Sequence, residues 1–110
     1  MRFDLRQPCD DCPFLKHGGI RLRRSRAEEI GAMMLSPDGG TFACHKTTEA
    51  GGSAGPEQHC AGALIFAENN DISTQAMRIA ERLRIYDHRR LIDRGKVFAD
   101  LAAMLAAQDE

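Results

Sequence analysis

The sequence has no tryptophan and few other aromatic residues, with five phenylalanines and one tyrosine among its 110 residues. Its core must therefore be built mostly from leucine, isoleucine, methionine and phenylalanine, and such a core is thin. No apolar run of signal-peptide length follows the first residue, and none approaches the 18 or more apolar residues of a membrane span. We expect a cytoplasmic chain with one domain, 1–110, which a metal or cluster would help to stabilise.

Net charge is also nearly absent, because 15 basic and 16 acidic residues give a formal charge of -1 at pH 7. This balance excludes a uniformly basic nucleic-acid binder. The choice of basic residue is uneven, however, since 12 of the 15 are arginine. The planar fork of arginine suits phosphate, so the distribution of arginines decides whether a phosphate-binding surface is present.

Hydrophobic periodicity predicts several helices. In the stretch SRAEEIGAMML, Ser25 and Glu28 form a capping-box pattern at the start of a helix that ends before SPDGG. A second helix is expected over CAGALIFA, 60–67. A third starts at residue 71 or 73 and ends near residue 85, and the last covers about 96–107.

The remaining segments are predicted to be extended or irregular. Residues 1–8 are expected to form an extended arm, and CDDCPF, 9–14, to open a short helix. TFACH, 41–45, is short enough for a strand, whereas the polar, glycine-rich stretch 46–58 is expected to be an exposed loop. We therefore predict a mostly α fold, with a small α+β fold as the alternative. It is a single compact, metal- or cluster-stapled domain with about four helices and at most two short strands.

The four cysteines carry the main functional signal. They are Cys9, Cys12, Cys44 and Cys60, which gives the spacing C-x2-C, 31 residues, C-x15-C and leaves no cysteine over. In a reducing cytosol such a set is more typical of a metal site than of disulfides. Two residues between Cys9 and Cys12 let both sulfur atoms point to one side of a turn, where they can bind the same ion or cluster. The fold must bring in the other two.

Two inorganic centres suit four thiolates, a zinc ion and a [4Fe-4S] cluster. Structural zinc sites usually present a second tight pair of ligands, which the C-x15-C spacing lacks. A cluster accepts single ligands from separate segments, so the spacing favours a [4Fe-4S] cluster, with Zn2+ on the same four cysteines as the alternative. Other residues near the cysteines also favour a cluster. They are Pro13 after Cys12, Gly62 after Cys60 and three phenylalanine rings. These rings belong to Phe14, Phe42 and Phe66.

The motifs CDDCPF, FACHKT and CAG, in this order, resemble those of a family of small uncharacterised proteins from bacteriophages and bacteria, with the pattern C-x2-C-P-[FW], F-x-C-H-K and C-A-G. The cysteine spacing is separately similar to the cluster ligation of iron-sulfur uracil-DNA glycosylases. This resemblance implies a [4Fe-4S] cluster held by Cys9, Cys12, Cys44 and Cys60, and a link to nucleic acid. It does not imply glycosylase activity, because those enzymes are longer and contain an α/β/α domain whose parallel-sheet pattern is missing here.

The segment RLRRSR has four arginines in six residues and no acid among them. Converging guanidinium groups can bind a nucleic-acid backbone, so this segment is the first candidate for a DNA or RNA contact. The other arginine groups, within 78–84 and 89–94, lie among acidic residues and are expected to form solvated, salt-paired faces. The candidate nucleic-acid residues are Arg21, Arg23, Arg24 and Arg26.

Catalysis has little support in the sequence. An enzyme acting on a nucleobase or nucleic acid, related to the iron-sulfur uracil-DNA glycosylases, would need an acid or base near the metal, and the candidates are Asp10, His45 and His59. No set of nucleophile, base and orienting group is visible, so we assign no catalytic residue. We expect the two histidines to support the cysteines or to face solvent. The predicted function is a small cluster-binding protein whose cluster is structural or redox-sensing.

Overall fold

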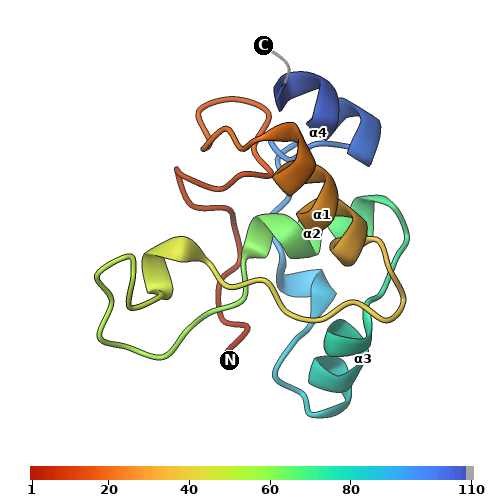
Figure 1. The fold of residues 1–110 in the computed structure, drawn as a ribbon. Helices are drawn as coiled ribbons and strands as arrows, with labels where there is room; N and C mark the ends of the chain where they lie inside the picture. Colours follow the sequence, from red (N-terminus) through yellow and green to blue (C-terminus); the bar gives the residue numbers. More distant parts are fainter. Residues whose placement is uncertain (109–110) are drawn as a thin grey trace.

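The computed structural model describes residues 1–108, and the apolar helix α2 (Ala61–Asn69) lies at its centre (Figure 1). The first seven residues of α2 are all buried, which fits a run without a polar side chain. Helix α1 (Arg24–Met34) packs against α2 and against α4 (Leu101–Gln108). Helix α3 (Gln75–Arg82) lies lower in the view of Figure 1, apart from this group.

The prediction of a mostly α fold with about four helices is confirmed. Residues 1–108 contain four α-helices and two short 3-10 helices, η1 (His45–Thr47) and η2 (His88–Arg90). Their radius of gyration is 12.9 Å. A single compact domain of this length is expected to have a value of about 13 Å.

Apolar spacing in the sequence predicts one buried face on each of two helices, and both faces are largely confirmed. The predicted residues are Ala27, Ile30 and Met34 on α1, and Met77, Ala80 and either Leu83 or Arg84 on α3. Ile30 and Met34 of α1 are buried, and so are Met77 and Ala80 of α3. Leu83, one of the two residues expected to continue the face of α3, is 65 % exposed. It follows the last helical residue, so the helical spacing no longer directs it towards the core.

The start of α1 differs from the prediction. Its N-cap is Arg23, no side chain caps it, and the capping box of Ser25 and Glu28 does not form. A tertiary contact holds this end instead, because the Leu22 N–H donates to the side-chain oxygen of Gln108 at 2.8 Å. Helix α1 therefore begins where the end of α4 holds the chain.

Helices α3 and α4 begin later than predicted, each after a residue with a capping oxygen. Thr74 Oγ1 accepts from the Met77 N–H at 3.2 Å, and Asp100 Oδ1 accepts from the Ala103 N–H at 2.8 Å. The segment 96–98, assigned to the last helix by its periodicity, lies outside α4 and pairs with another segment.

Strand-like pairing within residues 1–108 is confined to three isolated bridges between distant segments. They join residues 2 and 58 in parallel, and residues 43 and 59 and residues 15 and 97 antiparallel. These bridges take the place of the short strands expected from the sequence. The second closes the loop 45–58, and the third ties the segment after the first cysteine pair to the C-terminal part of the chain.

Helices α2 and α3 end in the same hydrogen-bond pattern, a Schellman motif. After α3, the Arg84 N–H donates to the Glu81 carbonyl and the Ile85 N–H to the Ala80 carbonyl, each at 3.0 Å. The residue in the left-handed conformation is Asp71 after α2 and Arg84 after α3, with φ of 56° and 60°. Glycine is the usual residue at this position because it has no Cβ.

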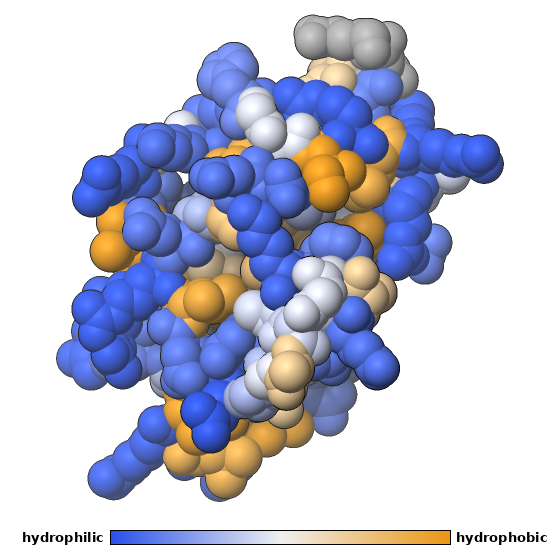
Figure 2. All heavy atoms as spheres, turned by 90° about the vertical axis from the view of Figure 1, so that its left-hand side faces the viewer, coloured by the Kyte–Doolittle hydropathy of each residue, from blue (hydrophilic) through white to orange (hydrophobic). Residues whose placement is uncertain are grey.

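Polar side chains cover most of the face seen in Figure 2, while apolar side chains gather at the bottom of that view. Three large apolar residues of α3 and the segment directly after it are exposed: Ile79, Leu83 and Ile85. Among residues 1–108, no helix combines the length and the apolar character needed to cross a bilayer.

Candidate metal centre

The segment CDDCPF forms two successive turns, so the helix expected there is absent. The Cys12 N–H donates to the Cys9 carbonyl and the Leu15 N–H to the Cys12 carbonyl, each at 3.2 Å. Gly19 lies so close to the Cys12 carbonyl that a Cβ at position 19 would overlap it. The bridge between Leu15 and Val97 holds the far end of these turns. The first cysteine pair is therefore fixed by contacts on both sides.

A bridge brings Cys44 and Cys60 together across the long loop. The Cys44 N–H donates to the Gln58 carbonyl at 2.8 Å, and the Cys60 N–H donates to the Phe42 carbonyl at 2.7 Å. The loop between them, 45–58, is mostly exposed, as predicted. Antiparallel pairing thus supplies the close second pair that the C-x15-C spacing does not reveal.

All four cysteines line one cavity of about 270 Å³. Cys12, Cys44 and Cys60 are at most 4 % exposed, Cys9 is half-buried, and all four are free thiols. The sulfur atoms of Cys12 and Cys60 are 3.4 Å apart. The Cys9 thiol interacts with those of Cys44 and Cys12. The structure therefore gathers the four cysteines singled out in the sequence.

Backbone N–H groups point at two of the sulfur atoms. Cys60 is the N-cap of α2, and its sulfur accepts a hydrogen bond from the Ala63 N–H at 3.4 Å. The Cys12 sulfur accepts backbone hydrogen bonds that include one from Gly62 in the first turn of α2. A Cβ at position 62 would overlap this sulfur, so only glycine lets the helix approach so closely. These donors favour negative charge on sulfur.

Hydrogen bonding divides the thiols by acidity. The hydrogen bond between Cys12 and Cys60 lowers the pKa of Cys12 and raises the pKa of Cys60, so Cys12 ionises first. Burial raises the pKa of Cys9 to about 11, and the neighbouring thiols of Cys44 and Cys12 add to this rise. Full ionisation of the set therefore needs a cation among the sulfur atoms, as metal binding supplies.

Phenylalanine rings form an apolar wall beside the cysteines. Phe42 lines the cavity, and the ring of Phe14 packs against the ring of Phe42 with 5.8 Å between their centroids. Phe14 also contacts Phe66 of α2, at 5.0 Å between centroids. The three rings proposed from the sequence as a shell are thus one contiguous cluster. Such a cluster limits the access of water from this side.

Polar side chains lie at the rim of the cavity, where Asp11, Arg26 and His45 line it and are partly or fully exposed. Arg26 Nη1 lies 2.9 Å from Glu29 Oε1, and Asp11 Oδ2 lies 3.9 Å from the Lys46 amine. The two charged residues, Asp11 and Arg26, therefore have partners of opposite sign. The rim is polar, in contrast to the aromatic wall.

His59 is fully buried and braces the second cysteine pair. Its Nε2 accepts from the Phe42 N–H at 3.2 Å, and its Nδ1 lies 3.1 Å from the Cys60 carbonyl, so the proton is on Nδ1. Burial lowers the pKa of His59 to about 4. Both ring nitrogens are thus engaged by the backbone. Of the other acid–base candidates, Asp10 is exposed and does not line the cavity, whereas His45 lines it.

The arginines of RLRRSR are mostly engaged within the protein. Arg21 and Arg24 donate to backbone carbonyls, at 2.8 Å and 3.3 Å, and Arg26 pairs with Glu29 at 2.9 Å. Arg23 is exposed at the N-cap of α1. The spacing of charges gave no sign of these carbonyl partners, because they come from tertiary packing. A nucleic-acid contact through the four arginines stays a prediction.

Within residues 1–108, no three His, Cys, Asp or Glu side chains are arranged to hold a metal ion as they stand. The donor set nevertheless fits a soft metal, since it consists of four thiols with backbone N–H groups beside the sulfur atoms. The cavity of about 270 Å³ is also far larger than the roughly 10–15 Å³ that one water molecule needs. Its size leaves room for a centre larger than a single ion.

No family model, no curated protein and no solved structure matches this chain. The fold and the cavity therefore define the class of protein by themselves, as a small α-helical chain with four thiols around one cavity. The resemblance to the family with the C-x2-C-P, F-x-C-H-K and C-A-G motifs rests on those motifs alone.

Proposed function

We propose that this protein binds a [4Fe-4S] cluster through Cys9, Cys12, Cys44 and Cys60. The observation that carries the proposal is that all four thiols line one cavity of about 270 Å³ with an aromatic wall. The cysteines come from separate segments, and a cluster accepts ligands arranged in this way. Four cysteines can bind the four iron atoms of such a cluster, one each, and leave no iron open to a substrate.

The proposed role of the cluster is to join parts of a thin core and to respond to oxidants. It would connect the turns at 9–12 with the bridge at 43 and 59 and with the start of α2. Cys9 is the least buried of the four ligands, so oxidants would reach the cluster from its side. The cytoplasm, where such a cluster is protected by a reducing environment, is the proposed location. DNA or RNA is the proposed partner.

A zinc site on the same four cysteines is the second candidate. In a tetrahedral site with Zn–S bonds of 2.3 Å, the sulfur atoms lie about 3.8 Å apart. Cys12 and Cys60, with sulfur atoms 3.4 Å apart, are already close to this separation. The other two thiols would have to move to the same centre.

Anaerobic purification followed by metal and sulfide analysis separates the two candidates. A cluster predicts brown protein with about four irons and four sulfides per chain, because the cubane contains four of each. One zinc per chain without sulfide would refute the cluster and support the zinc site. Protein that takes up neither metal, even after reconstitution with iron, sulfide and a thiol reductant and, separately, with zinc, would refute both.

Single Cys→Ser variants test the ligand set. Each of the four is expected to reduce cluster occupancy severalfold, since serine is a poor ligand for iron in a cluster. His45→Ala is the matched control, because His45 lines the same cavity and follows Cys44 directly. It should keep the occupancy of the wild type. Loss of the cluster in His45→Ala, with retention in one Cys→Ser variant, would show that the imidazole is a ligand instead.

A further inference from the structure

A second cavity, of about 240 Å³, lies between the N-terminal arm and the segment that follows α3. Arginines from three places in the chain line it: Arg6, Arg84 and Arg90. Phe3 and Leu91 are among its apolar lining residues. The cavity shares no lining residue with the cysteine cavity, so its function can be tested separately.

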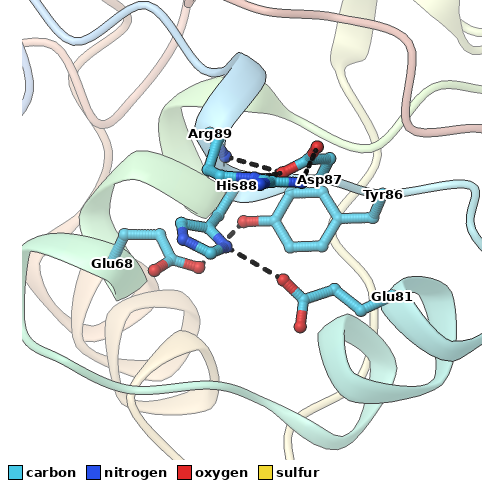
Figure 3. Close-up of polar contacts among 6 residues, drawn as sticks. All are labelled: Glu68, Glu81, Tyr86, Asp87, His88 and Arg89. Atoms are coloured by element: carbon cyan, nitrogen blue, oxygen red, sulfur yellow. Dashed lines mark hydrogen bonds and ion pairs between the residues drawn. The ribbon is translucent and has the colours of Figure 1, made fainter.

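The two carboxylates that line this cavity already have partners. Asp87 binds Arg89 through both oxygens, with Nε to Oδ1 at 3.0 Å and Nη2 to Oδ2 at 3.1 Å (Figure 3). Asp4 Oδ2 accepts from Gln58 Nε2 at 3.3 Å and lies 3.9 Å from a guanidinium nitrogen of Arg2. Neither Arg89 nor Arg2 lines the cavity, so each acid is balanced from outside it.

The three arginines of the cavity lack such partners. Within residues 1–108, their guanidinium groups form no hydrogen bond and no ion pair. The other acids nearby are also engaged, since Glu68 Oε1 accepts from the Tyr86 hydroxyl at 2.9 Å and Glu81 Oε1 lies 3.1 Å from His88 Nδ1 (Figure 3). Three positive charges therefore meet at one cavity without a counterion from the protein.

The backbone of Arg84 adds an independent observation. This residue occupies the left-handed position of the Schellman motif after α3, with φ of 60°. Asp71, at the same position after α2, belongs to a residue type that tolerates this conformation, whereas an arginine is strained there. Backbone strain of this kind is concentrated at sites where a side chain has a function. Since glycine would fit the turn better, the arginine at this position is best explained by a role of its side chain.

We propose that this cavity binds a phosphate monoester that carries a flat organic group, the chemistry of a nucleotide. The guanidinium groups would bind the phosphate oxygens, because their planar forks match phosphate and remain charged at all physiological pH values. Phe3, Leu5 and Leu91, which also line the cavity, would offer apolar contacts to the organic group. The source of this chemistry is either a free nucleotide or the phosphorylated end of a nucleic-acid strand.

Calorimetric titration of the full chain tests the proposal, with thymidine 5′-monophosphate, thymidine and inorganic phosphate as probes. The monophosphate is expected to bind, more weakly as salt is added, and thymidine is expected not to bind. A 5′-phosphorylated oligothymidylate is compared with the monophosphate to distinguish the two sources. Tighter binding of the oligonucleotide supports a strand end, and equal binding supports a free nucleotide. If the monophosphate does not bind, or binds no better than thymidine, the proposal is wrong.

Arginine variants separate binding from folding. Arg84→Gly should weaken binding of the monophosphate at least tenfold. It should also raise the thermal midpoint of unfolding, because glycine relieves the strained backbone. Arg90→Ala should weaken binding similarly without this gain in stability. The matched control is Arg82→Ala, which removes an exposed arginine of α3 that does not line the cavity. Equal affinities in the Arg84, Arg90 and Arg82 variants would overturn the assignment. The same titrations on protein treated with a chelator show whether binding at this cavity is independent of the cysteine centre.

Discussion

Among single residues, Gly62 decides how closely α2 approaches the first cysteine pair. Its N–H donates to the Cys12 sulfur, and the space that a side chain would need is occupied by that sulfur. The C-A-G motif was visible in the sequence, but the neighbour that requires the glycine lies 50 positions earlier in the chain. Local patterns identify such a glycine as unusual in a helix without revealing what it touches.

Gly62→Ala should therefore destabilise the protein by about 1–3 kcal/mol through overpacking. This is the opposite of the effect expected from helix propensity, in which alanine is the better residue. Urea unfolding followed by circular dichroism measures the change. Gly40→Ala is the control, because nothing lies within 4 Å of the Cβ added there. Equal stability of the two variants would contradict the close contact with Cys12.

Tyr86 predicts a dependence of stability on alkaline pH. Burial, together with its hydrogen bond to Glu68, raises the pKa of Tyr86 above its usual value (Figure 3). The unfolded chain then loses this proton at about pH 10, while the folded chain retains it. This contribution to stability is complete below pH 10 and is lost as the pH rises above it.

Tyr86→Phe removes the titrating group and supplies the comparison. It should lower the free energy of unfolding at neutral pH by about 1 kcal/mol, the value of one hydrogen bond. Above pH 10 its stability should fall less steeply than that of the wild type, so the two curves converge. Parallel curves from pH 8 to pH 11 would show that the phenol does not cause the alkaline loss.

Among the elements, helices were predicted better than their ends. The run ALIFA and the spacing of Ile30 and Met34 identify α2 and the buried face of α1 because both signals are local. The start of α1 depends on the contact between Leu22 and Gln108, and such a tertiary contact leaves no trace in a short window of sequence. Asp100, in contrast, was a readable signal for the start of α4, since aspartate is a preferred N-cap.

The caps make a direct test of this difference. Asp100→Ala should destabilise the protein by about 1 kcal/mol, because the Ala103 N–H loses its acceptor. Ser25→Ala should not destabilise it, since Ser25 lies inside α1 and does not cap it. Chemical unfolding of both variants provides the measurement. An equal loss of stability in Ser25→Ala and Asp100→Ala would instead support the predicted capping box of Ser25 and Glu28.

At the scale of the whole molecule, the sequence identified the four cysteines but not how the second pair meets. The C-x15-C spacing hides the bridge between Ala43 and His59, because pairing across a long loop is set by the fold rather than by neighbouring residues. The unpaired charge of Arg6, Arg84 and Arg90 at the second cavity was equally invisible, since it depends on which acids each arginine reaches in the fold. Both sites are assembled from segments far apart in the chain.

Removal of the proposed metal centre should lower the stability of the whole molecule. A ligand that binds only the folded state contributes about 4 kcal/mol when its free concentration is 1,000 times its Kd. Protein treated with a strong chelator should thus unfold at a lower temperature, and iron and sulfide, or zinc, should restore the midpoint. Scanning calorimetry of the loaded, stripped and reconstituted chain measures this. An unchanged midpoint after complete removal would mean that the centre does not stabilise the fold.

The bridge between Leu15 and Val97 also sets an order of events during synthesis. The Lys16 N–H donates to the Lys96 carbonyl, and the Phe98 N–H donates to the Phe14 carbonyl, so the turns that carry the first cysteine pair are held by residues that are translated much later. A nascent chain on the ribosome lacks this support until those residues emerge. Under the proposal of a metal centre, we therefore expect delivery of iron or zinc to follow the translation of Lys96, because the first pair of thiols is unsupported before then.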